Sequence, residues 1–139
     1  MRQIGFNNFR KFQSFPQIDL SPISIFVGEN NAGKSTVVKA IIALLDFLNS
    51  RYFEIDRNKD EKAILEHQFF FNRSYFAHIG TFKRALYNKA DENCISFTIT
   101  LDDYKIDVEV TGDKKDEEAI SGRITKMTIL MLLYNVELT

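Results

Sequence analysis

The residues with the clearest chemical meaning lie in the segment 28–36, which reads GENNAGKST. Residues 28–35 match the phosphate-loop pattern G-x-x-x-x-G-K-[ST] at every required position. A loop of this kind directs consecutive backbone N–H groups inward and forms a cradle for anionic oxygens. The helix that follows adds unpaired N–H groups and the positive end of its dipole. The pattern therefore predicts that this segment binds the phosphates of a nucleoside triphosphate, ATP with Mg²⁺.

Each required residue of the pattern has a physical role. Gly28 and Gly33 allow backbone angles and a close approach that a side chain would prevent. Lys34 is expected to reach the β- and γ-phosphates, the Ser35 hydroxyl to hold Mg²⁺, and Thr36 to donate to the α-phosphate. The predicted nucleotide-binding residues of the segment are Gly28, Asn30, Asn31, Ala32, Gly33, Lys34, Ser35 and Thr36, and Ser35 is also the predicted metal ligand.

A strand and a helix are expected to position this loop. Residues 23–27 form a nearly continuous β-branched apolar run, which is typical of a buried strand in an α/β sheet. Residues 34–48 predict a helix covered on most sides, because its apolar run over 37–48 is interrupted only by Lys39 and Asp46. A glycine-rich turn that contains Lys-Ser by chance is the alternative explanation. The order strand, loop, helix is the one that phosphate binding requires, and it favours the functional interpretation.

The rest of the chain predicts mainly strands. Ile95 to Leu101 alternate apolar and polar side chains, and the next alternating run predicts a β-hairpin around the turn Asp102-Asp103. Thr81 is a plausible cap for a short helix. The other predictions are strands over 2–12, 15–20 and 124–136, helices over 63–71 and 81–87, and solvated loops over 51–62 and 112–122.

Composition limits the class of protein. A chain of 139 residues with 45% apolar residues can form one folded domain, and 13 phenylalanines make its core Phe-rich. A formal charge of −1 excludes a globally basic surface. The single cysteine, Cys94, cannot form an internal disulfide, and no segment predicts export or membrane insertion. We therefore expect a soluble cytoplasmic protein that does not contact a membrane.

Two segments carry a resemblance to a known family. The opening Asn8-Phe9-Arg10-Lys11-Phe12 and the loop GENNAGKST resemble the N-terminus of ATP-binding-cassette (ABC) ATPases of the SMC–RecF branch. The most similar subgroup is that of the OLD-like ATPases of DNA repair and anti-phage defence. The resemblance is strong over residues 1–48, weak over 75–110 and absent beyond. It implies a role for Arg10 and Lys11 near the base or phosphates of the nucleotide, although two solvated charges on an edge strand explain them as well.

The resemblance also implies the fold and the assembly. It implies an α/β fold of the phosphate-loop NTPase type, namely an ABC-ATPase-like N-terminal lobe whose mixed sheet joins antiparallel strands to the phosphate-loop strand and helix. The chain would be one partial domain over residues 1–139. Residues 1–48 would hold the first strands, the loop and its helix, 49–94 a loop and short helices, and 95–136 the hairpin and last strand. A homodimer of the full-length protein and a link to DNA follow by family analogy alone.

Two further parts of such an active site have no clear counterpart in the sequence. The family needs a buried strand ending in Asp-Glu, but the alternation before Asp102-Asp103 marks a half-exposed strand and a hairpin turn. It also needs a signature segment. Ile120-Ser121-Gly122 is only weakly similar to that segment, and we interpret it as a turn. The chain is therefore expected to be the N-terminal lobe of a longer ATPase, with little turnover by itself and no catalytic residue assigned.

Two alternatives remain beside an ATPase lobe. A nucleotide sensor would bind ATP without hydrolysing it, whereas a small kinase is disfavoured because such enzymes continue with alternating strands and helices. The aromatic run 69–76, with Arg73, Lys83 and Arg84 nearby, could form a stacking platform for single-stranded nucleic acid. Burial of these rings in the core is the stronger explanation.

Overall fold

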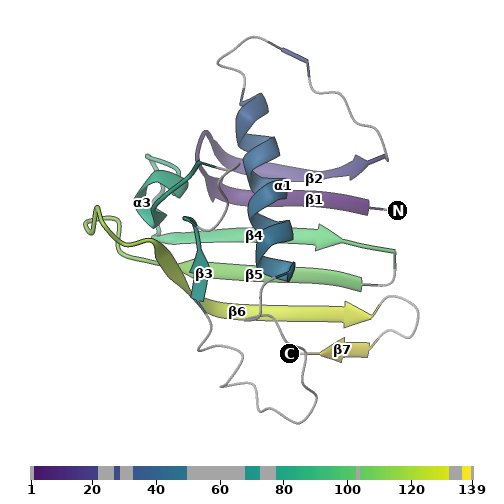
Figure 1. Ribbon diagram of the computed structural model, residues 1–139. Helices are drawn as coiled ribbons and strands as arrows, with labels where there is room; N and C mark the ends of the chain where they lie inside the picture. The colour runs from purple at the N-terminus through teal and green to yellow at the C-terminus, as the bar shows by residue number, and fades with distance from the viewer. Residues whose placement is uncertain are drawn as a thin grey trace.

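An antiparallel sheet with one long helix across a face makes up most of the described chain (Figure 1). The computed structural model describes residues 2–21, 27–28, 33–49, 68–72, 78–102, 104–131 and 136–138. The seven strands are ordered β2-β1-β4-β5-β6-β3, and β7 pairs with β6. Their bounds are β1 Arg2–Phe9, β2 Phe12–Leu20, β3 Gln68–Phe70, β4 Cys94–Thr100, β5 Tyr104–Thr111, β6 Ser121–Met131 and β7 Val136–Leu138, and the helices are α1 Lys34–Asn49 and α3 Phe82–Ala85.

The predicted α/β fold with a mixed sheet is wrong for the described residues. Every strand pairing that the structure describes is antiparallel. Short connections explain this, because only two residues join β1 to β2 and only three join β4 to β5, and parallel neighbours would need a long crossover. The predicted phosphate-loop strand over 23–27 lies outside the described residues except for Val27.

The hydrophobic core fills the space between α1 and the sheet. Alternate side chains of β4 and β5 are buried, so each strand presents every second residue to the helix. Phe47 of α1 stacks on Phe69 of β3 with 4.9 Å between ring centroids, and Phe69 stacks on Phe97 of β4 at 5.3 Å. This aromatic path joins α1 to β3 and β4 through phenylalanine rings.

One buried ring packs the short helix α3 against the sheet. Phe82 is fully buried and lies against Gly112 and Gly122, where an added Cβ would come within 2.5 Å of the Phe82 ring and of Val110 respectively. Thr81 caps the helix as predicted, since its side chain accepts a hydrogen bond from the Arg84 N–H. The ring therefore packs α3 against the residue that follows β5 and against the start of β6.

Other elements differ from prediction in detail. The helix predicted over 34–48 is α1, and the predicted hairpin is β4 with β5. Gln68–Phe70 is a strand rather than the end of a helix, because it pairs with β6 about fifty residues away. The single strand predicted over 124–136 is two strands, β6 and β7, which pair with each other. The predicted loop over 51–62 lies outside the described residues.

Candidate functional site

The N-terminal end of α1 carries the predicted phosphate-binding residues that the structure describes. The helix begins at Lys34, and the carbonyl of Gly33 accepts the N–H groups of Thr36 (3.0 Å) and Val37 (3.2 Å). The ammonium of Lys34 folds back and donates to the carbonyl of Gly28 at 2.5 Å. This contact connects Gly28 at one end of the loop with Lys34 at the other.

Gly33 has a left-handed backbone with φ of 88°. An added Cβ would lie 2.6 Å from two carbons of the Phe12 ring, which is much closer than real Cβ atoms approach other atoms. Phe12 is itself held by Phe15 and Phe6, with ring centroids 5.1 and 5.9 Å away. Two requirements, the backbone angle and the close approach of the ring, therefore restrict this position to glycine.

Buried polar groups normally form hydrogen bonds, and the hydroxyl of Thr36 departs from this rule within the described residues. Thr36 is fully buried, and its Oγ1 has no hydrogen-bond partner among the residues that the structure describes. An unpartnered buried hydroxyl costs about 1–3 kcal/mol. Ser35, its neighbour, is exposed on the same first turn. The arrangement fits an oxygen-rich ligand at this end of the helix, where Thr36 would donate and Ser35 would meet a cation.

Replacing Thr36 by valine tests this interpretation. Thr36→Val keeps the shape and removes the unpartnered hydroxyl, so we expect the free energy of unfolding without ligand to stay the same or to rise by about 1 kcal/mol. Affinity for MgATP should fall several-fold. Urea unfolding and nucleotide titration measure the two quantities. Thr125→Val is the matched control, because its Oγ1 contacts Thr111 and the Glu109 carbonyl and its loss should destabilise the fold. A large destabilisation by Thr36→Val would contradict the interpretation.

Arg10 and Lys11 form the tight turn between β1 and β2. Arg10 has a left-handed φ of 52°, which is costly for a residue with a side chain. Its N–H donates to the Ala85 carbonyl at 2.7 Å, and the Tyr87 N–H donates to the Asn8 carbonyl at 2.8 Å. These bonds join the turn to the end of α3. Lys11 is exposed. The turn leads directly into Phe12, so the predicted residues Arg10 and Lys11 lie next to the ring that touches Gly33.

Two basic residues join Arg10, and the sequence did not single out either of them as a ligand of the loop. The charge of Arg84 on α3 acts on Arg10, and burial followed by the charges of Arg10 and Arg84 lowers the pKa of Lys39 on α1. Burial and the charge of Arg84 lower the pKa of Arg10 as well. One signal was present for Lys39, since it is one of only two charges within the apolar run of α1.

Three predicted residues cannot be placed, and one rejected acidic residue can. Asn30, Asn31 and Ala32 lie outside the described residues. Asp102 is exposed in the bend after β4, and the pairing of Gln3 with Thr100 and of Asn7 with Ser96 places it at the opposite end of β1 from Arg10.

Two weaker sequence hypotheses can also be judged. Phe69 and Phe71 are buried in the core, so these two rings are not a stacking platform, whereas Tyr75 and Phe76 lie outside the described residues. Ser121 and Gly122, interpreted as part of a turn, instead begin β6.

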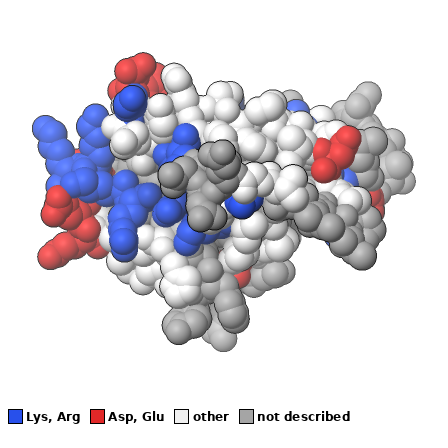
Figure 2. All heavy atoms as spheres, turned by 90° about the horizontal axis from the view of Figure 1, so that it is seen from above, with Lys and Arg blue, Asp and Glu red and all other residues white. Residues whose placement is uncertain are grey.

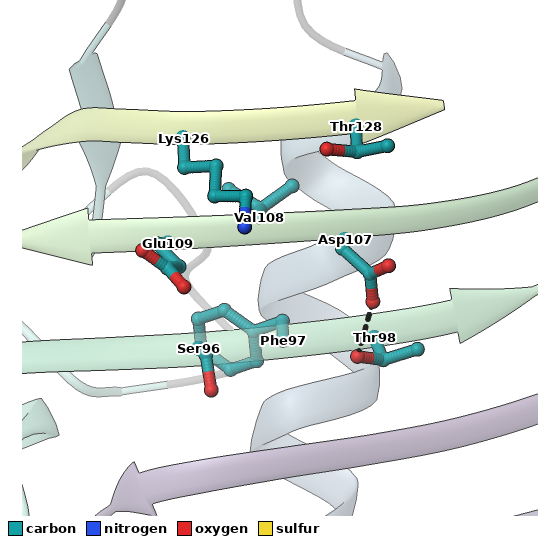
Figure 3. A pocket seen from close by; sticks show the side chains of 8 residues that line it. All are labelled: Ser96, Phe97, Thr98, Asp107, Val108, Glu109, Lys126 and Thr128. Carbon is teal, nitrogen blue, oxygen red and sulfur yellow. Dashed lines mark hydrogen bonds between the residues drawn. The ribbon is translucent and has the colours of Figure 1, made fainter. Parts of the chain in front are cut away.

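A groove of about 350 Å³ lies on the other face of the sheet (Figure 3). It is lined by polar side chains of β4, β5 and β6, and the hydroxyl of Thr98 donates to the Asp107 carboxylate at 2.6 Å. Figure 3 shows α1 behind the strands, while these polar side chains point the opposite way. No predicted site residue lines this groove. It is the solvated face of a half-exposed sheet.

The arrangement at α1 is that of a phosphate-binding protein, with Gly-Lys-Ser-Thr at a helix start and a basic side chain folded onto the loop. The chain belongs to the AAA ATPase domain family, whose model matches residues 1–138. A comparison with curated proteins gave no match. Membership of this family indicates nucleotide binding of the ATPase type, usually with Mg²⁺. Among the described helices, none has the length and apolar character needed to cross a membrane.

Proposed function

We propose that this chain binds MgATP at the loop 28–36 and serves as the N-terminal lobe of an ATPase of the SMC–RecF–OLD-like branch, acting in DNA repair or anti-phage defence. The observation that carries the proposal is the first turn of α1, where Lys34 closes the loop onto Gly28 and where the buried hydroxyl of Thr36 has no partner among the described residues. The match to the AAA ATPase domain family supports nucleotide binding. The opening Asn8-Phe9-Arg10 supports assignment to the SMC–RecF–OLD-like branch. A role in repair or defence, dimer formation and an interaction with DNA follow from family analogy.

The residues present fit a triphosphate with Mg²⁺. Lys34 would exchange the Gly28 carbonyl for phosphate oxygens, since its ammonium already lies at the loop. The exposed hydroxyl of Ser35 would hold the metal ion and the buried hydroxyl of Thr36 an inner phosphate oxygen. A bound Mg²⁺ ion would neutralise part of the negative charge of the phosphates. The N–H groups of the first helical turn complete the contacts to the anion.

A direct test is the dependence of ATP binding on Mg²⁺. Isothermal titration of the wild type should give tighter binding with Mg²⁺ than with EDTA. Ser35→Ala should remove most of that difference, about tenfold, because it deletes one oxygen ligand of the metal. Ser35→Thr keeps the hydroxyl and should retain the Mg²⁺ effect. Equal Mg²⁺ dependence of the wild type and Ser35→Ala would refute the metal role, and a wild type that binds no ATP would refute the proposal.

A nucleotide sensor is the second candidate, and the position of Asp102 favours it. The sequence indicates that Asp102 belongs to a hairpin turn rather than to the acidic end of a buried strand, and Asp102 lies at the far end of β1 from Arg10. Phosphate release under single-turnover conditions separates the two candidates. Release that is abolished by Lys34→Ala indicates an ATPase lobe, and binding without release indicates a sensor.

A further inference from the structure

The ring of Phe12, the first residue of β2, lies directly against Gly33 of the phosphate loop. The three atoms nearest to a Cβ added at Gly33 all belong to this ring, with Cε2 and Cζ at 2.6 Å and Cε1 at 3.7 Å. These three atoms form the outer edge of the ring. The sheet therefore touches the loop through one edge of one aromatic side chain.

Other rings hold Phe12 in place. Phe12 makes edge-to-face contacts with Phe6 and Phe15, at 5.9 and 5.1 Å between ring centroids and with interplanar angles of 66° and 62°. Phe6 and Phe15 stack on each other at 4.6 Å, and Phe6 is buried in the core. Aromatic rings prefer contacts of these two kinds. The edge that faces Gly33 is thus a fixed part of the sheet.

Gly33 is held from a second side by the helix. Its carbonyl accepts the N–H groups of Thr36 and Val37, while its Cα meets the Phe12 ring. Glycine adopts left-handed and right-handed backbone angles with similar ease, so the residue itself does not select the observed φ of 88°. The helix on one side and the ring on the other restrict Gly33 to this conformation.

The surroundings of the loop suit a polyphosphate rather than a base beside Phe12. Figure 2, which views the molecule from the β2 side, shows Lys and Arg side chains gathered at one end, and such a surface attracts an anion. A base stacks on an open ring face. Phe12 is half-buried, and its ring contacts Phe6, Phe15 and Gly33. The contact to Gly33 therefore concerns the part of the loop that holds phosphates.

We infer that Phe12 is a positioning residue, which holds the loop through Gly33 in the conformation that binds the polyphosphate chain and does not touch the ligand itself. This inference rests on the proposed function. A loop that is ordered before binding binds more tightly, because its ordering does not reduce the affinity. Removal of the ring should therefore weaken the binding of any ligand that carries the polyphosphate, whether or not it carries a base.

The test compares two leucine variants by isothermal titration with MgATP and with inorganic triphosphate plus Mg²⁺. Phe12→Leu should weaken both ligands about tenfold, as expected if the binding conformation falls to about a tenth of the population. Phe15→Leu is the matched control. It removes the same atoms from the same strand and the same group of rings, but it leaves the atoms nearest to Gly33 in place. It should lower the urea midpoint as much as Phe12→Leu does and leave both affinities unchanged.

Phe12→Met provides a second variant in case Phe12→Leu does not fold. Methionine nearly preserves the side-chain volume, but its chain is flexible and offers no fixed edge to Gly33. We expect it to fold with a urea midpoint near that of the wild type and to lose affinity for both ligands. An effect on binding without an effect on stability is one that a purely structural role of the ring would not produce.

Each other outcome has a definite meaning. Wild-type affinities in Phe12→Leu and Phe12→Met, with Lys34→Ala still impaired, would overturn the inference and leave the proposed function standing. An equal loss of affinity in Phe15→Leu would show that general destabilisation is the cause, and would also overturn it. Weaker MgATP binding with unchanged triphosphate binding would place the base on the ring, against the inference. A wild type that binds neither ligand would overturn the inference and the proposed function together.

Discussion

Lys34→Ala is expected to remove the thermal stabilisation that MgATP gives to the wild type. At a nucleotide concentration 100 times the Kd, binding adds about 2.7 kcal/mol to the free energy of unfolding. For a chain of this length, that stabilisation raises the Tm by about 9 °C. The variant loses the ammonium that now donates to Gly28 and that would contact the β- and γ-phosphates. Differential scanning fluorimetry with and without MgATP measures the shift.

The comparison must use the ligand-induced shift rather than the Tm itself. Loss of the Lys34–Gly28 hydrogen bond lowers the Tm of the variant slightly even without ligand, since an exposed bond of this kind contributes about 1 kcal/mol. Lys114→Ala, in the exposed loop after β5, is the matched control and should keep the full shift. Equal shifts in wild type and Lys34→Ala would show that the loop does not bind the nucleotide.

Gly33→Ala is expected to impair both stability and binding. The new Cβ would lie 2.6 Å from the Phe12 ring on a backbone with φ of 88°. Overpacking and the left-handed angle together should cost about 2–4 kcal/mol. The loop can relieve the clash only by moving away from the ring, which alters the cradle. We expect a lower urea midpoint and no stabilisation by MgATP.

A second variant separates the two causes. Phe12→Leu combined with Gly33→Ala makes room for the Cβ but leaves the left-handed backbone, so it should recover part of the stability that Gly33→Ala loses. Nucleotide binding should stay weak if the backbone angle shapes the cradle. Unchanged stability of Gly33→Ala would contradict the described contact, and normal binding by that variant would contradict the need for a tight loop.

The sequence predicted local elements well where short-range signals agree. The apolar run gave the helix that is α1, the strict alternation gave β4 and β5, and Thr81 gave the cap of α3. Pairings between distant segments could not be read in the same way. Three residues of β3 reveal no period, and their state depends on β6, which lies about fifty positions later. The α/β class was inferred from the phosphate-loop strand and from the family resemblance, and the antiparallel pairing of the described strands overturned it.

The candidate site was predictable only in part for a similar reason. The motif identified Lys34, Ser35 and Thr36 because their spacing is local. The contact of Phe12 with Gly33 and the mutual effect of the charges of Arg10, Lys39 and Arg84 depend on how β1, α1 and α3 pack together. A lysine within the apolar run of α1 was a signal for Lys39, whereas the sequence around Arg84 did not indicate that its charge would act on Arg10.

The placement of Phe82 between Gly112 and Gly122 has a consequence for synthesis on the ribosome. The helix α3 has only four residues and cannot persist alone, so Arg84 takes its position when the ring enters the slot formed by β5 and β6. Gly122 lies 38 residues after Arg84 in the chain. The N-terminal loop therefore emerges early, while the arginine that faces the β1–β2 turn settles only after the later strands have folded. The contact between the end of α3 and the β1–β2 turn would thus form late during translation.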